Sequence, residues 1–492
     1  MIELKNVSFR YVASDSSALP DGSAGGLGEE VSNGSLKDIS LSVSEGEFVL
    51  LNGGSGCGKT TILRLINGLI PNFYEGQLTG QVTVNGTDVS KAELYDTAKF
   101  VSTVFQNPRS QFFNVDTTSE LAFACENRGM PKEEILRRME DVVFALHLEP
   151  LMNRSLFDLS GGQKQKIACA SVAVTQNKII LLDEPSANLD TKTIGELRSL
   201  LAKWKNEGKT IVVAEHRISY LWDLADRTIV LKNGEILSEL DRTKMNSVTE
   251  DQLHEMGLRS HRADFGAQTK GSNSSVTRQE EDSFTVQDFR YSYRGGRKAL
   301  DIPLMKIPQK KITAIVGNNG EGKTTFLNCL CGLGRRSKGK LLYAGKTYRR
   351  KARQKLIYLV MQDVNHQLFT ESVLDEVLIS QEEENEEEAR KILSSLDLEE
   401  FADRHPMSLS GGQKQRVAVA CAVASGRELL LFDEPTSGLD YTHMKQIGSI
   451  LRKLKEMEKT VIVVTHDREL IDECCDEVLN LHDFNRATSE AR

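Results

Sequence analysis

The stretch Gly53-Gly54-Ser55-Gly56-Cys57-Gly58-Lys59-Thr60-Thr61 decides the fold. It has the spacing G-x-x-x-x-G-K-[ST], it follows the apolar run 48–51, and an apolar helical pattern begins at Ile62. Strand, glycine loop and helix form the context in which this motif binds phosphate. Glycines let several backbone N–H groups turn toward one phosphate, and the helix N-terminus adds the positive end of its dipole. We expect Lys59 to reach the β- and γ-phosphates and Thr60 to ligate Mg²⁺.

The same stretch recurs as Gly317-Asn318-Asn319-Gly320-Glu321-Gly322-Lys323-Thr324-Thr325, which lies 264 positions later (323 − 59). Two copies in 492 residues indicate an internal duplication. A chain of this length fits two domains of about 240 residues. We predict a first domain at 1–258, a linker at 259–283 and a second domain at 284–492. The segment 13–35, rich in Ser, Gly, Asp and Ala, is expected to be a flexible surface insertion.

Composition narrows the function classes. The net charge of −8 and the pI of about 5.8 disfavour a nucleic-acid binder, which usually has a basic excess. No segment has the roughly 20 consecutive apolar residues of a membrane helix. The N-terminus has no signal-peptide pattern, and none of the eight cysteines has C-x-x-C metal-site spacing. We therefore expect a cytoplasmic chain, with any membrane role exerted through a partner.

Further motifs follow each phosphate loop in one order. In each half a strand ends in a glutamine, a segment Leu-Ser-Gly-Gly-Gln-Lys-Gln opens a helix, an apolar strand ends in Asp-Glu-Pro, and a later strand ends near a histidine. The matching positions are Gln106 and Gln362, Ser160 and Ser410, Asp183-Glu184 and Asp433-Glu434, and His216 and His466. From the serine to the histidine the offset between the halves is constant, since 410 − 160, 434 − 184 and 466 − 216 all equal 250.

Each of these residue types also has a plainer interpretation. Tyr11 and Tyr293, which match near the start of each half, suit stacking on adenine but are also ordinary strand aromatics. The histidines could be buried structural residues, and the glutamines could be surface residues. Apolar strands before each Asp-Glu pair argue against an exposed turn, since α/β folds place their chemistry where parallel strands end.

Together the motifs resemble those of the ATP-binding-cassette (ABC) ATPases, over nearly the whole chain and twice. The resemblance implies an α/β fold with two tandem P-loop NTPase domains, each with a core sheet, an antiparallel β subdomain and a helical signature subdomain. It implies an ATP hydrolase that uses Mg²⁺. The implied catalytic residues are Glu184, Glu434, His216, His466, Gln106 and Gln362. The implied Mg²⁺ ligands are Thr60, Gln106, Asp183, Thr324, Gln362 and Asp433.

The resemblance also implies how ATP is bound. Each phosphate loop in full, with Tyr11 and Tyr293, is expected to hold nucleotide on one side. In the family two cassettes pack head to tail, so the signature of one cassette closes the site of the other. We expect Ser160 to face Lys323, and Ser410 to face Lys59, within one chain. The signature residues concerned are Ser160, Gly161, Gly162, Gln163, Ser410, Gly411, Gly412 and Gln413.

The segments after each glutamine carry a finer resemblance. Residues 105–113, Phe-Gln-Asn-Pro-Arg-Ser-Gln-Phe-Phe, and 122–127, Ala-Phe-Ala-Cys-Glu-Asn, are similar to segments of energy-coupling-factor importers, and 361–369 keep a related form. In that group the ATPases drive a transmembrane coupling protein, which serves a substrate-binding membrane subunit, and the cargo is a vitamin or a transition-metal ion. The chain would then lie at the cytoplasmic face of the membrane. We expect Glu120 and Glu376 to offer carboxylates to a basic residue of the coupling protein.

Two alternatives stay open. One is the fused ATPase of a sugar importer, although its signatures usually diverge from Leu-Ser-Gly-Gly-Gln in one half. The other is a soluble double-cassette translation or repair factor, although such proteins usually carry a charged helical linker or zinc cysteines. Neither feature is present here, and no nucleic-acid partner is expected.

Overall fold

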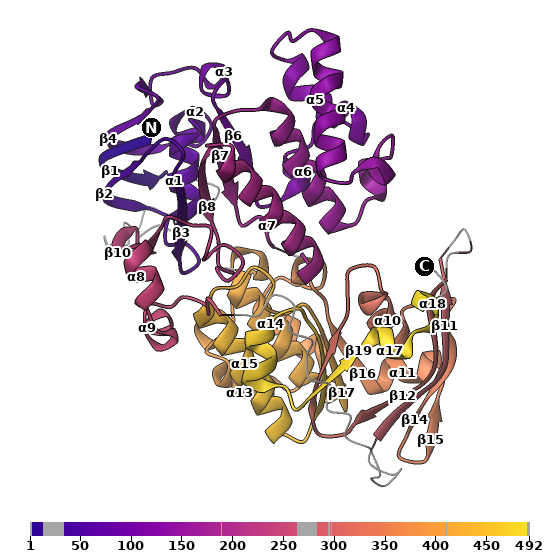
Figure 1. The fold of residues 1–492 in the computed structure, drawn as a ribbon. Helices are drawn as coiled ribbons and strands as arrows, with labels where there is room; N and C mark the ends of the chain where they lie inside the picture. Colours follow the sequence, from indigo (N-terminus) through magenta and orange to yellow (C-terminus); the bar gives the residue numbers. More distant parts are fainter. Residues whose placement is uncertain are drawn as a thin grey trace. The chain divides into compact units, whose positions relative to one another are not determined.

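The computed structural model describes residues 2–12, 34–187, 189–262, 283–293, 296, 298–409 and 411–489. The chain divides into two compact units, residues 1–265 (unit one) and 266–492 (unit two), shown in Figure 1. Most of the expected insertion 13–35 and most of the expected linker 259–283 lie outside the described residues, as do Asn188 and Ser410. The predicted domain boundaries therefore stay predictions.

The core of unit one is a six-stranded sheet in the order β10-β9-β3-β8-β7-β6. Its central strands β3 (Phe48–Gly53), β7 (Ile179–Asp183) and β8 (Thr210–Ala214) are buried at every residue, which explains their unalternating apolar sequences. The flanking strands are β6 (Val101–Val104), β9 (Arg227–Lys232) and the antiparallel β10 (Glu235–Asp241). Because β3, β6, β7, β8 and β9 run parallel, the residues that follow β3, β7 and β8 meet at one edge of the sheet.

A second, antiparallel sheet of unit one has the order β2-β1-β4-β5. Its strands are β1 (Ile2–Tyr11), β2 (Leu36–Val43), β4 (Gly76–Val84) and β5 (Thr87–Asp88). Asn85 and Gly86, with φ of 51° and 80°, make the turn between β4 and β5, as the Asn-Gly pair predicts. Helix α1 (Lys59–Ile66) follows the phosphate loop, and its apolar residues pack into the same core cluster as this sheet.

A group of helices completes unit one. α4 (Thr117–Glu126), α5 (Lys132–Ala145) and α6 (Gly161–Thr175) enclose their own apolar cluster, and Figure 1 shows them as a group beside the parallel sheet. α7 (Thr191–Asn206) packs on that sheet through residues such as Leu197 and Trp204. The short elements are α2 (Leu69–Asn72), α3 (Leu94–Thr97), α8 (Arg242–Ser247), α9 (Glu250–Glu255) and the 3₁₀ turns η1 (Pro108–Ser110), η2 (Glu149–Leu151) and η3 (Leu156–Asp158).

Unit two repeats this plan. Its parallel sheet has the order β16-β17-β18-β13-β19, and its antiparallel sheet has the order β12-β11-β14-β15. The strands are β11 (Ser283–Ser292), β12 (Lys298–Pro308), β13 (Ile312–Val316), β14 (Lys338–Tyr343), β15 (Lys346–Tyr348), β16 (Ile357–Val360), β17 (Leu429–Asp433), β18 (Thr460–Val464) and β19 (Glu477–Asn480). The predicted α/β class, with a core sheet, an antiparallel sheet and a helical group in each half, is confirmed.

The helices of unit two also match those of unit one. They are α10 (Lys323–Leu330), α11 (Arg350–Leu356), α12 (Val373–Ser380), α13 (Glu386–Ser395), α14 (Gly411–Ala424), α15 (Tyr441–Glu456), α16 (Arg468–Cys474), α17 (Leu481–Phe484), α18 (Arg486–Ser489) and the 3₁₀ turns η5 (Val364–His366), η6 (Glu399–Phe401) and η7 (Pro406–Ser408). Figure 1 shows α10 and α11 beside the antiparallel sheet of this unit. Among the described residues, no helix is long and apolar enough to span a membrane.

Candidate active sites

Each phosphate loop is closed around its lysine. Lys59 Nζ donates to the carbonyl oxygens of Gly53 and Gly54, both at 2.9 Å. Lys323 Nζ donates to the matching oxygens of Gly317 and Asn318, at 2.7 and 3.1 Å. Both lysines are buried, so each loop has an ammonium group at its centre. A phosphate bound in the loop would supply the opposite charge.

The first glycine of the loop is required by its surroundings. Gly53 has φ of 144°, and a Cβ there would meet the carbonyl oxygen of Leu231 on the neighbouring strand β9. A side chain at this position would push the loop away from the sheet edge. The loop geometry thus depends on the sheet beneath it, which the spacing of the motif alone does not show.

The aspartates that end β7 and β17 are suited to a magnesium ion. Asp183 Oδ1 accepts from the Thr60 hydroxyl at 3.0 Å, so the two expected ligands already meet. Burial, with a smaller contribution from Glu184, raises the pKa of Asp183 to about 6. Burial also raises the pKa of Asp433, whose buried Oδ1 has no hydrogen-bond partner among the described residues. Hydroxyl and carboxylate oxygens are the donors that Mg²⁺ prefers, so these residues fit the ion.

The next residue in each strand is a glutamate in an uncommon conformation. Glu184 and Glu434 have φ of 43° and 48°, which few residues other than glycine adopt. In unit one, Gln106 Nε2 donates to Glu184 Oε2 at 2.8 Å, and His216 Nε2 lies 3.3 Å from Glu184 Oε1. Strained backbone that aims a carboxylate at other polar side chains is typical of functional sites.

The charge state of Glu184 follows from these neighbours. Burial acts to raise its pKa, but hydrogen bonding and charge from His216, with the charge of Lys59, outweigh burial and hold the pKa below its usual range. Glu184 is therefore ionised at neutral pH. An ionised carboxylate beside the phosphate loop can orient and polarise a water molecule.

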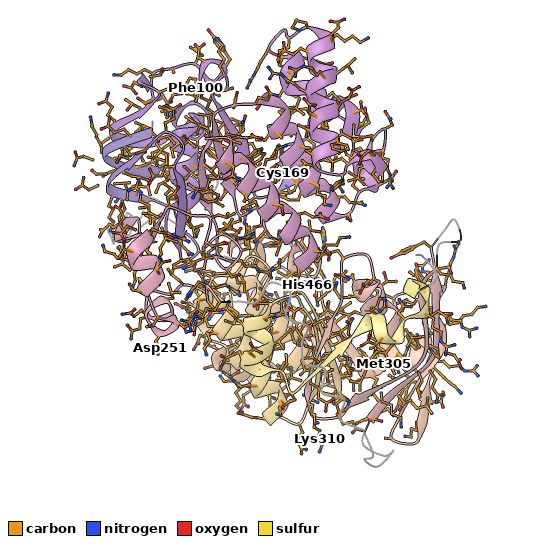
Figure 2. The ribbon with its side chains drawn as sticks, viewed as in Figure 1. Phe100, Cys169, Asp251, Met305, Lys310 and His466 are labelled. Carbon is orange, nitrogen blue, oxygen red and sulfur yellow. The ribbon has the colours of Figure 1, made fainter. Side chains whose placement is uncertain are left out.

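Unit two has the same arrangement with small differences. His466 Nε2 lies 3.5 Å from Glu434 Oε1, and the backbone N–H of His466 donates to Glu434 Oε2 at 3.3 Å. His466, which Figure 2 labels, comes just after β18 ends. The side chain of Gln362 is exposed to solvent. The structure thus brings together the aspartate, glutamate and histidine of each unit at the edge that carries the phosphate loop.

The expected adenine-stacking residues lie beside the phosphate loop. The Tyr11 hydroxyl is 3.1 Å from Thr61 Oγ1 and also accepts from Arg64 at 3.0 Å. The Tyr293 hydroxyl is 2.6 Å from Thr325 Oγ1. Both tyrosines therefore contact the second threonine of their loop, and stacking on adenine stays a prediction.

The signature segment of unit one forms a rigid, exposed helix start. Ser160 Oγ accepts from the backbone N–H of Gln163 at 3.3 Å, and Gln163 Oε1 accepts from the N–H of Ser160 at 3.0 Å. This reciprocal capping fixes the N-terminus of α6. Ser160 and Gly161 are exposed, so the positive end of the helix dipole faces outward from the unit.

A buried carboxylate that was not predicted from the sequence lies beside each histidine. Glu215, at the end of β8, accepts from the backbone N–H groups of Ser186 and His216 and from the Tyr220 hydroxyl, at 3.3, 3.0 and 3.0 Å. Asp467 in unit two accepts from the Thr436 hydroxyl at 2.7 Å. The carboxylate precedes the histidine in unit one and follows it in unit two. In unit one the available signal was a charged residue directly after a buried, mostly apolar strand.

The prediction that Glu120 and Glu376 offer carboxylates to a partner is wrong. Each side chain is only 3% exposed. Glu120 Oε2 accepts from the backbone N–H groups of Phe113 and Asn114 at 3.0 and 2.9 Å, and Glu376 Oε1 accepts from those of Phe369 and Thr370. Both carboxylates are therefore buried and already accept hydrogen bonds. Each one lies on the helix that contacts the segment following the glutamine of its unit.

In each unit the buried glutamate accepts a hydrogen bond from the backbone of an exposed phenylalanine. Phe113 is 76% exposed and Phe369 is 74% exposed. Phe113 stacks on Phe123 with ring centroids 4.9 Å apart. Ile379, which is 58% exposed, occupies in unit two the position of Phe123, since 379 − 123 and 369 − 113 both equal 256. Each unit thus has two apolar residues at matching positions, which we call its apolar pair.

Comparison with known proteins decides the family. The family model described as "ABC transporter" matches residues 36–187 and 300–437. The chain belongs to the ABC transporter family. A relative from Treponema denticola, which carries the provisional name ABC transporter ATP-binding protein, is 44% identical over 98% of this chain and 95% of its own length. A relative from Methanosarcina acetivorans with the same provisional name is 31% identical over 97% of this chain and 84% of its own length.

The chain is therefore a tandem ABC ATPase that binds and hydrolyses ATP. Among solved structures, the archaeal ribosome recycling factor aABCE1, in complex with the ribosomal stalk protein aP1, matches with a TM-score of 0.61 and 24% identity. That match covers 91% of this chain and 85% of the other. At this identity the likeness establishes the tandem α/β fold and nothing further.

Proposed function

We propose that the chain is the ATPase component of an energy-coupling-factor type importer for a vitamin or a transition-metal ion. Both sites would hydrolyse ATP and drive a separate transmembrane coupling protein, which serves a substrate-binding subunit. The chain would thereby be held at the cytoplasmic face of the membrane. The names of the relatives, which are ABC transporter ATP-binding proteins, support a transport role.

The observation that carries this proposal is one exposed phenylalanine in each unit, Phe113 and Phe369. Phe113 and Phe369 follow the glutamines by the same seven positions, and each is held outward by a buried glutamate. A large exposed aromatic side chain loses contact with water at little entropic cost when a partner covers it. The two pairs are suited to receive two apolar contacts from one membrane protein.

Within each site the roles divide as the geometry suggests. Asp183 and Thr60, with Gln106, would hold Mg²⁺, which would neutralise charge on the phosphates. Glu184 would orient and polarise the attacking water, and His216 would fix the carboxylate. Asp433, Thr324, Gln362, Glu434 and His466 would act in the same way in unit two.

The two ATP molecules would be enclosed within one chain, with the signature of each unit over the phosphate loop of the other. The exposed, capped start of α6 supports this, since its N–H groups point away from unit one. A cysteine pair at Ser160 and Asn319 should crosslink within the monomer when ATP is bound. Crosslinked dimers without any internal product would contradict the arrangement.

Replacement of the exposed phenylalanines tests the transport role. Phe113→Ser with Phe369→Ser should release the ATPase from the membrane subunits during co-purification, while ATP hydrolysis by the free chain stays within about twofold of the original. Phe144→Ser is a matched control, because Phe144 on α5 is also 74% exposed and belongs to neither pair.

Two results would contradict the proposal. One is co-purification of the double variant with the membrane subunits at the original yield. The other is co-sedimentation of the chain with ribosomes and with no membrane protein, which would favour the soluble translation-factor alternative that the fold also accommodates.

A further inference from the structure

Unit two carries a strongly basic surface that ATP hydrolysis does not require. Residues 335–355 contain ten arginines and lysines and no acidic residue. They form β14, β15, most of α11 and the turns between them. Since the whole chain carries −8, the rest of it carries −18 (−8 − 10). So dense a cluster on an acidic protein is a local feature, and it does not follow from composition.

Most of these side chains face solvent without a counter-charge. Eight are exposed, and we call them the basic surface: Arg335, Arg336, Lys338, Lys340, Lys346, Arg349, Lys351 and Lys355. None of the eight has an ion-pair partner within 4.0 Å among the described residues of the chain. Like charges this close repel one another, so the cluster has an electrostatic cost that an anionic partner would remove.

The other two arginines of the segment hold this surface in place. Arg353 is fully buried, donates to the carbonyl oxygen of Cys329 at 3.0 Å and lies 4.6 Å over the ring of Phe289. Arg350 donates to the carbonyl oxygen of Gly332 at 3.3 Å. These contacts fasten α11 to the end of α10 and to the antiparallel sheet. The exposed charges of α11 are thus presented by a fixed support.

The matching segment of unit one carries no such cluster of basic residues. That segment lies between the phosphate loop of unit one and Gln106, at residues 71–99. It contains two lysines and four acidic residues. Its two lysines, Lys91 and Lys99, each pair with a nearby aspartate, at 3.1 and 2.7 Å. The nucleotide motifs are present in both halves, so a feature confined to one half serves something other than hydrolysis.

We propose that the basic surface binds the anionic headgroups of a lipid membrane. The inference rests on the proposed function, because a chain held at a membrane by its partner has such a surface within reach. An apolar residue accompanies the charges: Leu333, 49% exposed, stands two positions before Arg335. Arginines beside an exposed leucine suit the interface of a bilayer, where the charges meet phosphates and the leucine enters the headgroup region.

A nucleic acid fits this surface less well. Proteins that bind single strands usually add exposed aromatic rings on which bases stack. Here the ring of Tyr343 is already stacked on Phe284, with centroids 4.1 Å apart, and Tyr348 is half-buried against Tyr343. α11 has only seven residues, so it is too short to lie along a groove as a recognition helix does.

Binding of the purified full chain to protein-free vesicles tests the proposal independently of any transporter partner. We expect binding to vesicles with about 30% anionic phospholipid, little binding to neutral vesicles, and loss of binding as salt is raised. Arg335→Glu with Arg336→Glu and Lys351→Glu should weaken partitioning by at least about 100-fold, since each basic residue near an anionic surface contributes roughly fivefold. ATP hydrolysis by this variant should be unchanged.

The control variant makes the same change of charge on unit one, with Lys91→Glu, Lys132→Glu and Lys232→Glu, all exposed. It should bind anionic vesicles within about twofold of the original chain. Equal loss in both variants, or equal binding to neutral and anionic vesicles, would overturn the proposal. Displacement from vesicles by duplex RNA at an equal phosphate concentration would assign the surface to nucleic acid instead. If vesicle binding behaves as expected but no membrane subunit co-purifies, the transport proposal fails and this one stands.

Discussion

The two candidate nucleotide sites of this chain agree in the glutamate and the histidine and differ in the groups around them. Glu184 and Glu434 share an uncommon backbone conformation, and the nearby histidines lie 3.3 and 3.5 Å from them. One position away, Glu215 of unit one has no acidic match, because Thr465 stands there and the carboxylate is Asp467. The comparison shows that the glutamate and the histidine lie alike in both units, whereas the carboxylate that supports them comes from a different position in each.

Further differences lie in the phosphate loops and at the starts of α7 and α15. Position 57 of the first phosphate loop is a cysteine, and its match in the second loop, position 321, is a glutamate that accepts from the backbone N–H of Asn318 at 2.9 Å. Thr193 at the start of α7 is matched by His443 at the start of α15. Each difference gives a way to make one site resemble the other.

The largest effect is expected at the glutamates themselves. Glu184→Gln and Glu434→Gln should each lower turnover at their own site by about 10² to 10⁴, because a positioned base is lost, while ATP binding remains. If the sites are equivalent, each single variant should lower the steady-state rate, and the double variant should have almost none. The control is Glu133→Gln, an exposed glutamate on α5. A double variant that hydrolyses ATP at the original rate would refute the assignment.

A smaller but still large effect is expected at the buried carboxylate of unit one. Glu215→Ala would leave the Tyr220 hydroxyl and the backbone N–H of Ser186 without their acceptor. Calorimetry should show unit one destabilised by about 2–4 kcal/mol, with a lower kcat from the misplaced His216. The double change Glu215→Thr with Arg217→Asp builds the Thr-His-Asp order of unit two and should recover part of both losses. No recovery would show that the two supports are not equivalent.

An intermediate effect is expected in the second phosphate loop. Glu321→Gln removes a negative charge from a loop that must receive phosphates, so ATP should bind to unit two about 3- to 10-fold more tightly. Titration of the Glu184→Gln, Glu434→Gln background with labelled ATP measures this without turnover at either site. Cys57→Ser at the matching position of unit one should change affinity little. Weaker binding by the Glu321 variant would show that the carboxylate shapes the loop more than it repels the nucleotide.

The smallest effect is a pH dependence confined to unit two. The hydrogen bond to Asp440, at 2.8 Å, raises the pKa of His443 above its usual range despite partial burial. A raised folded-state pKa stabilises unit two fully at pH below about 6.5, and this contribution is lost as the pH rises through the folded-state value. Because the ring is partly exposed, less than about 1 kcal/mol is expected. His443→Thr, the residue of unit one, should remove the loss of stability of unit two that calorimetry shows as the pH rises above about 6.5. An unchanged profile would contradict this account.

The sequence predicted the duplicated fold and the order of the site residues, because glycine loops, buried parallel strands and their polar ends leave strong local patterns. It failed where a side chain's partner is distant in the chain or its burial depends on packing. Glu120 and Glu376 were expected to face a partner, since nothing in a helix sequence shows that a carboxylate folds back onto the preceding segment. Glu215 was overlooked for the same reason, because its acceptor role depends on the turn around Ser186.

The central claim is that the phosphate loops of both halves of this chain hold ATP. Counting the nucleotide retained by the Glu184→Gln, Glu434→Gln double variant after rapid removal of free ATP tests it most directly. Two ATP molecules per chain, both unhydrolysed, is the result expected from two intact phosphate loops with their lysines, threonines and aspartates in place. One ATP per chain, with the second site empty at saturating ATP and Mg²⁺, would contradict the claim.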